Sequence, residues 1–134
     1  MKEINSLKKI ELSPVTYTDE RGWVVNPFEA ITLPKESVSF FHVVNTKSGH
    51  IRGNHYHTNT TEWLLICGGT SHVAWRPVDS KESHTYEITT PAMFEIPPNI
   101  AHAILNTGDN DNLLISFCDS PERDTVRCDS LFDR

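Results

Sequence analysis

The stretch GHIRGNHYHTNTTEWLLICGG, residues 49–69, decides how this chain folds. It holds two histidines two positions apart and a glutamate at the head of a short apolar run. Side chains alternate between the two faces of a β-strand, so His55 and His57 point to one side, about 7 Å apart along the strand. Two imidazoles so placed can bind one metal ion. The polar residues 58–61 let the chain double back, which brings Glu62 beside both histidines.

Outside this stretch the chain consists of many short segments with strand character. Each is rich in β-branched and aromatic residues and is followed by turn-forming sequence such as DERG, CGGT or NTGDND. Besides the HYH segment, the predicted strands are 15–18, 22–26, 38–45, 62–67, 71–76, 84–89, 92–96, 101–106 and 112–118. The tail at 121–134 has a weak helical period and predicts at most a short C-terminal helix. About ten short strands predict one all-β domain over residues 1–134, a closed sandwich or barrel.

Composition argues against several classes of function. The net charge is −6, with 12 basic against 18 acidic residues and no basic run, so general binding to the phosphate backbone of nucleic acid has little support. The longest aliphatic run, WLLIC, is far too short to cross a bilayer, and the charged N-terminal segment is unlike a secretory signal. Three cysteines without a paired spacing argue against a disulfide framework. The sequence therefore predicts a soluble, cytoplasmic protein without a nucleic-acid or membrane partner.

A further candidate ligand comes from a later strand. In IPPNIAHAILN, residues 96–106, His102 follows a proline-asparagine turn and shares a strand face with Asn106. A sheet that closes into a barrel can bring this strand beside the first hairpin. Glu62 would be unfavourable among apolar neighbours such as Leu64 without a partner, which favours a metal there.

These two segments resemble the two cupin motifs. The first reads Gly49-x5-His55-x-His57-x4-Glu62-x6-Gly69, and the second reads Pro97-x-Asn99-x2-His102-x3-Asn106. Asn99 and Pro91 stand where that superfamily usually has glycine, and asparagine tolerates positive φ better than most residues. The resemblance implies a cupin-type double-stranded β-helix, a jelly-roll barrel. It also implies one divalent transition metal inside the barrel, held by His55, His57, Glu62 and His102. Zinc, iron, nickel and manganese suit these ligands about equally, and copper is compatible too.

A second resemblance lies outside the metal motif. The segments TDERGWVVNPFEA (18–30) and RGNHYH (52–57) resemble the cupins that act on nucleotide-activated keto-sugars. These are the deoxysugar 3,5-epimerases, the 3,4-ketoisomerases and the C-terminal cupin domain of capsular polysaccharide-synthesising enzymes. The resemblance implies that Arg21 and Arg52 contact the substrate, usually its pyrophosphate, which suits the planar guanidinium. The run around Arg21 is also a good surface turn. Trp75 is expected to face the cavity, either as a wall of the substrate pocket or as an ordinary core residue.

The reaction that this resemblance implies is enolisation next to a ketone, in polysaccharide biosynthesis. Returning the proton to the other face epimerises the centre, and returning it elsewhere moves the ketone. In metal-free epimerases the base is the histidine that matches His55, but an imidazole bound to metal cannot easily accept a proton. Either His55 is the base and metal is absent or weak, or another group moves the proton, with His42 and Tyr17 as candidates. A metal-dependent dioxygenase and a non-enzymatic binding module are the alternative functions.

The segment 62–67 is apolar on both of its faces. Trp63, Leu65 and Cys67 lie on the side opposite Glu62 and are all hydrophobic. A strand that is apolar on both faces must be covered on both. We therefore expect either the N-terminal strand or a second subunit to pack over this face, and a homodimer is the favoured prediction.

Overall fold

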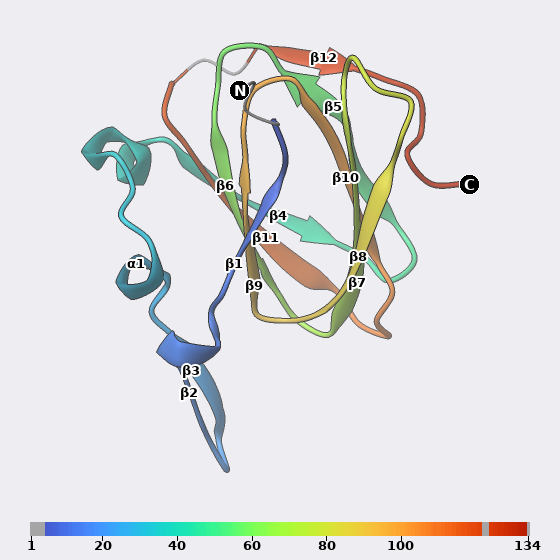
Figure 1. The fold of residues 1–134 in the computed structure, drawn as a ribbon. Coiled ribbons are helices and arrows are strands. Elements are labelled where there is room, and N and C mark those ends of the chain that lie inside the picture. Colours follow the sequence, from blue (N-terminus) through green and yellow to red (C-terminus); the bar gives the residue numbers. More distant parts are fainter. Residues whose placement is uncertain (1–4, 122–123, 134) are drawn as a thin grey trace.

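The computed structural model describes residues 5–121 and 124–133, which form two facing antiparallel sheets (Figure 1). The first sheet has the order β1 (Lys8–Ile10), β9 (Ala92–Ile96), β6 (Glu62–Cys67), β11 (Asn112–Cys118), β4 (Phe41–Thr46). The second has the order β12 (Thr125–Arg127), β5 (Ile51–His57), β10 (Ile100–Asn106), β7 (Thr70–Pro77), β8 (His84–Thr89). This arrangement confirms the predicted all-β jelly roll.

Most of the predicted strands form where the sequence places them. The bounds of β6, β8, β9 and β11 agree with the predicted segments. Within the predicted strand 38–45, the first residues instead belong to a 3-10 helix, η2 (Lys35–Ser39), and β4 starts after it. The expected C-terminal helix is wrong for the described part of the tail. There, Thr125–Arg127 forms β12, because its backbone pairs with the edge of β5.

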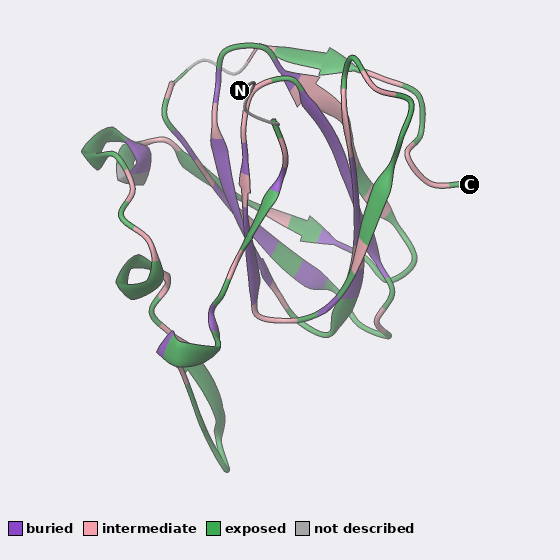
Figure 2. Cartoon of the chain, in the orientation of Figure 1, coloured by how far each residue is buried: buried purple, intermediate pink, exposed green. Residues whose placement is uncertain are grey.

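The core lies between the two sheets. Phe94 and Ile66 of the first sheet and Val73 and Ile100 of the second are fully buried and belong to one hydrophobic cluster. In Figure 2 the buried residues follow the strands that face one another. Buried apolar area is the main favourable contribution to folding, so this interface holds the sheets together.

A second hydrophobic cluster covers the outer face of the first sheet. Trp63, Leu65 and Met93 point outward from β6 and β9 and are buried by Leu12 and Val15. Val15 ends a short 3-10 helix, η1 (Ser13–Val15), that follows β1. The N-terminal segment therefore covers the apolar face of β6, which is one of the two expected solutions, and a second subunit is not needed there.

The remaining elements lie outside the sandwich. The strands β2 (Thr16–Asp19) and β3 (Gly22–Val25) form a separate two-stranded hairpin, followed by the single-turn helix α1 (Pro27–Ala30). The hairpin projects from the barrel at the end opposite β12 and is largely exposed (Figures 1 and 2). No helix in the described part of the chain is both long and apolar enough to span a membrane.

Candidate metal centre

Three of the four predicted metal ligands meet at one end of the sandwich. His55 and His57 extend from β5 and His102 from the neighbouring β10, and their ring centroids lie 4.9–5.7 Å apart. One nitrogen from each ring lies within 4.8 Å of the others. The parity argument for the HxH pair thus gives the observed placement, and the pairing of β10 with β5 sets His102 directly opposite His55.

Glu62 joins this group from the opposite sheet. Its Oε1 lies 3.2 Å from Nε2 of His102 and 3.7 Å from Nε2 of His57, and its Oε2 accepts a hydrogen bond from the hydroxyl of Ser116. Burial alone would raise the pKa of this carboxyl, but His102, His57 and Ser116 together hold it well below its usual value. Glu62 is therefore an anion in a buried site.

The second nitrogens of two rings fix their orientation. Nδ1 of His102 lies 2.9 Å from the carbonyl oxygen of Ile100, and because a carbonyl can only accept, Nδ1 carries a proton. Nδ1 of His57 lies 3.3 Å from the hydroxyl of Thr125. Nε2 of His102 then faces the Glu62 carboxylate. This contact is favourable with a cation at that point, either a second proton on the ring or a metal ion between the ring and the carboxylate.

The unpaired atoms of the site fit a metal ion. Nε2 of His57 and Oε1 of Glu62 are buried and have no hydrogen-bond partner in the part of the chain that the structure describes. Imidazole nitrogens and a carboxylate oxygen are ligands that zinc, iron, nickel and manganese accept. The side chains present therefore fit the predicted divalent ion.

The third ring, that of His55, differs from the other two in its surroundings. His55 is half-buried, and its pKa is lowered to about 4, first by burial and then by the neighbouring His102 and His57. Near neutral pH its imidazole is uncharged. A neutral ring can bind a metal or accept a proton, so charge alone does not decide between these roles.

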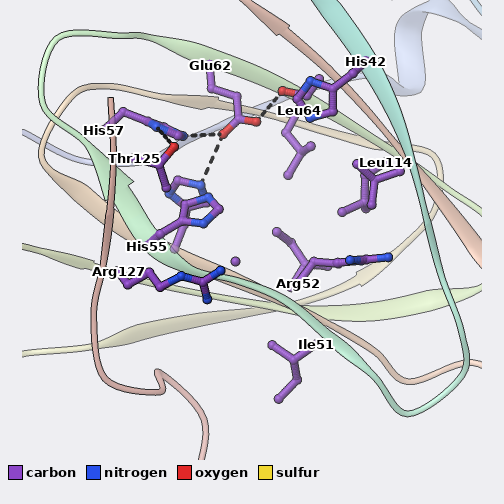
Figure 3. A pocket seen from close by; sticks show the side chains of 15 residues that line it. His42, Ile51, Arg52, His55, His57, Glu62, Leu64, Leu114, Thr125 and Arg127 are labelled. Carbon is purple, nitrogen blue, oxygen red and sulfur yellow. Dashed lines mark hydrogen bonds and ion pairs between the residues drawn. The ribbon is translucent and has the colours of Figure 1, made fainter. Parts of the chain in front are cut away.

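A cavity of about 380 Å³ opens beside this cluster (Figure 3). His42 and Val44 of β4 form part of one wall, and Arg52 forms part of another. Figure 3 shows Glu62, His55 and His57 gathered at one end of the space, with the Arg52 side chain lying along it. The cavity therefore combines a candidate metal centre with a fixed cation.

A β-bulge sets the position of Arg52. Across the β5–β10 ladder, His55 pairs with His102 but Gly53 pairs with Ala103, which leaves Asn54 as an extra residue with φ 59°. A Cβ on Gly53 would lie 2.6 Å from the carbonyl oxygen of His102, so only glycine fits there. The bulge restores Arg52 to the cavity side of the sheet.

Other predicted site residues lie elsewhere. Trp75 is buried in the core, stacked on His84 with ring centroids 4.4 Å apart, and it does not line the cavity. Of the two alternatives, a wall of the substrate pocket or an ordinary core residue, Trp75 is therefore the core residue. Tyr17 and Arg21 lie on the projecting hairpin, where the Arg21 guanidinium bonds to Asp19, and neither reaches this chain's own cavity.

Sequence reasoning missed two side chains from the last strand. Thr125, which contacts His57, and Arg127, which lines the cavity, both belong to β12. Their segment has mixed polarity and only three paired residues, so no periodic pattern marks it. Ser116 was missed as well, although its strand was predicted, because its position faces Glu62 only once the two strands pair.

Comparison with known proteins assigns this arrangement to a family. The family model described as polysaccharide biosynthesis C-terminal domain matches residues 17–129. The chain belongs to this family. The match includes both candidate metal motifs, all but the first residue of the β2–β3 hairpin, and β12. No curated protein matches the chain.

Solved structures with the same fold include a capsular polysaccharide assembling protein and two 3,4-ketoisomerases. The capsular polysaccharide assembling protein CapF from Staphylococcus aureus is 26% identical with a TM-score of 0.63, over 86% of this chain and 34% of CapF. The chain thus spans about a third of the CapF length. A 3,4-ketoisomerase from Helicobacter canadensis has a TM-score of 0.72 at 15% identity, over 92% of both chains. The 3,4-ketoisomerase QdtA from Thermoanaerobacterium thermosaccharolyticum, solved with TDP-4-keto-6-deoxyglucose, has a TM-score of 0.71 at 14% identity, over 93% of this chain and 89% of QdtA.

Proposed function

We propose that this family member is a metal-dependent cupin that epimerises or isomerises a nucleotide-activated keto-sugar in polysaccharide biosynthesis. The observation that carries the proposal is the cavity in which His55, His57, His102 and Glu62 converge beside Arg52. The polysaccharide family and the keto-sugar bound by a protein of the same fold support it. A divalent ion held by these four side chains would supply Lewis acidity toward a carbonyl oxygen.

The protein's own side chains divide the remaining tasks. Because the imidazole of His55 lies with His57 and His102, we assign it to the metal and not to proton transfer. His42 lines the cavity from β4, in the opposite sheet, and we assign it the role of the base that moves the proton next to the ketone. Arg52 donates one hydrogen bond to the carbonyl of Asn45, 2.8 Å away, which holds its guanidinium in place for an anionic group.

Exchange of substrate hydrogen for deuterium tests this assignment. The protein is incubated in heavy water with dTDP- and UDP-4-keto-sugars, and deuterium next to the ketone is followed by mass spectrometry. We expect exchange in the native protein and a loss of about 100-fold in His42→Gln with unchanged metal content. His50→Gln, outside the cavity, is the matched control. Exchange no faster than in buffer would exclude an isomerase, and oxygen consumption would favour the dioxygenase.

We also propose that the protein is a homodimer in which the hairpin of one protomer completes the site of the other. Tyr17 and Val24 on the hairpin are 56% and 61% exposed, as are Phe41 and Val43 on the outer face of β4 at 55% and 54%. Strand β4 ends its sheet and carries His42 toward the cavity. A second copy's hairpin that packs beside β4 would cover these apolar side chains.

This arrangement gives the two distant predicted residues a role. On their own chain, Arg21 and Tyr17 lie outside the cavity. A hairpin that crosses to the partner's β4 would bring them beside the partner's cavity instead. The expected cytoplasmic location stays a prediction.

A further inference from the structure

The last strand of the second sheet delivers a cation to the cavity. In the β12–β5 ladder Arg127 pairs with His55, Val126 with Tyr56 and Thr125 with His57. Thr125 and Arg127 both line the cavity, as expected for residues two apart on one strand. Figure 3 shows the Arg127 side chain next to His55, on the same side of the cavity as Arg52.

The charge of the cavity differs from that of the whole chain. The net charge of the protein is −6, yet the described residues that line the cavity include two arginines, Arg52 and Arg127, and a single carboxylate, Glu62. That carboxylate is buried and already contacted by His57, His102 and Ser116. The open part of the cavity is therefore cationic and suits an anionic ligand.

Arg127 is available for such a ligand. Its side chain is exposed, and it has no hydrogen bond or ion pair with any other described residue. Arg21, in contrast, forms a hydrogen-bonded ion pair with Asp19, 2.6 Å away, on the hairpin. Among the described residues of one protomer, the second guanidinium at the cavity is thus that of Arg127.

The strand that carries Arg127 is fastened on both sides. Before it, the carboxylate of Asp124 accepts hydrogen bonds from the backbone N–H groups of Thr58 and Asn59, at 3.1 and 3.4 Å. After it, Asn54 accepts from the N–H groups of residues 128 and 131, at 2.9 and 3.0 Å. Asn54 is the bulge residue of β5, so the distortion that turns Arg52 toward the cavity also anchors β12.

We propose that Arg127 is a substrate-binding residue that, together with Arg52, binds the diphosphate of a nucleoside diphosphate sugar. This inference rests on the proposed function and extends it. Two guanidiniums on neighbouring strands can each offer a planar pair of N–H donors, which matches two linked phosphates better than one point charge does. Because Arg127 belongs to the second sheet, it acts from the same protomer that holds the histidines.

Binding of nucleotides to single variants tests the proposal. The metal-loaded protein is titrated by calorimetry with dTDP and with UDP, and with thymidine as the uncharged counterpart. We expect Arg127→Gln to weaken diphosphate binding by about tenfold or more and to leave thymidine binding unchanged. Arg127→Lys keeps the charge but loses the planar fork, so its diphosphate affinity should lie between those of Arg127→Gln and the native protein. This variant takes the place of Arg127→Gln if the latter folds poorly. Lys81→Gln, in the exposed loop before β8, is the charge-matched control and should bind like the native protein.

The outcomes separate this inference from the isomerase itself. Diphosphate binding within twofold of native in Arg127→Gln, or no binding of either nucleotide to the native protein, would overturn the role of Arg127. In the exchange assay, Arg127→Gln should raise KM with little change in kcat, because the guanidinium lies at the bound diphosphate and not at the ketone. Native diphosphate binding that depends on Arg127, without deuterium exchange, would support this inference and exclude the isomerase. Deuterium exchange with an unchanged KM in Arg127→Gln would support the isomerase and overturn the role of Arg127.

Discussion

Arg52 and His55 face the same cavity although they are three residues apart on one strand. In a regular strand this odd separation would place them on opposite faces. The extra residue Asn54 shifts the alternation, so that Arg52 lies opposite Ile104 and His55 opposite His102. Ile104 and His102 both line the cavity, and their partners do so too. One bulge thus brings a candidate metal ligand, His55, and a candidate anion-binding residue, Arg52, into the same cavity.

Because of the bulge, we expect replacement of glycine to destabilise the protein more at Gly53 than at Gly49. Gly53→Ala would place a Cβ 2.6 Å from the His102 carbonyl and 2.9 Å from Cα of Ala103, at φ +105°. We expect it to lower the free energy of unfolding by about 2 kcal/mol or more. Gly49→Ala, at φ +79° with no atom within 4 Å, should lower it by only about 1 kcal/mol. Urea denaturation of both variants measures the difference, and equal losses would mean that the bulge does not need glycine.

Replacement of the buried carboxylate should weaken metal binding. Glu62→Gln keeps the shape of the side chain but removes the charge that faces His57 and His102. We expect at least about a tenfold loss of Zn²⁺ affinity in competition with a chelator. Glu87→Gln is the control, because Glu87 also lies beside a histidine, His72, but is exposed. Equal Zn²⁺ affinity in Glu62→Gln and the native protein would exclude Glu62 as a ligand.

Acid should destabilise the metal-free protein through His55. Its pKa is lowered to about 4 from the usual histidine value of 6.5, so between these pH values the unfolded chain binds a proton that the folded chain does not. The free energy of unfolding therefore rises with pH across this window and falls as the solution is acidified. In His55→Asn this contribution disappears, and the urea midpoint should depend less on pH between 4 and 6.5. An unchanged slope in the variant would contradict this explanation.

Complementation between variants tests the exchanged hairpin. Arg21→Ala loses the hairpin arginine and His102→Ala loses a candidate metal ligand, so each alone should be inactive in deuterium exchange. When the two chains are co-expressed, a mixed dimer holds one site with both residues if the hairpin crosses between protomers. Random pairing should then restore about a quarter of native activity. Co-expression of His102→Ala with Glu62→Gln is the control and should restore none. Absence of recovery in the first pair would place Arg21 outside the partner's site.

Much of the fold follows from local pattern. Strand β6 was predicted because apolar residues run between two turn-forming segments, and His55 and His57 share a face because two residues complete one strand period. Asn99 has φ 65°, which agrees with its predicted tolerance of positive φ. In each case the interactions that decide the structure lie within a few residues of sequence.

The parts that were missed depend on contacts between distant segments. The three residues of β12 have no strand pattern of their own and are extended because β5 offers an open edge. The bulge at Asn54 is set by the approach of β10 to Gly53, and its only local signal is a Gly-Asn pair inside a strand. Trp75 was predicted to face the cavity, but parity cannot tell whether an inward residue meets open space or packed side chains.

The contact between Glu62 and His102 joins the two sheets of the sandwich. An ion shared by these residues would link the two layers to each other. Local separation of the sheets at that end would then break its coordination, and a bound ion would in turn oppose that opening.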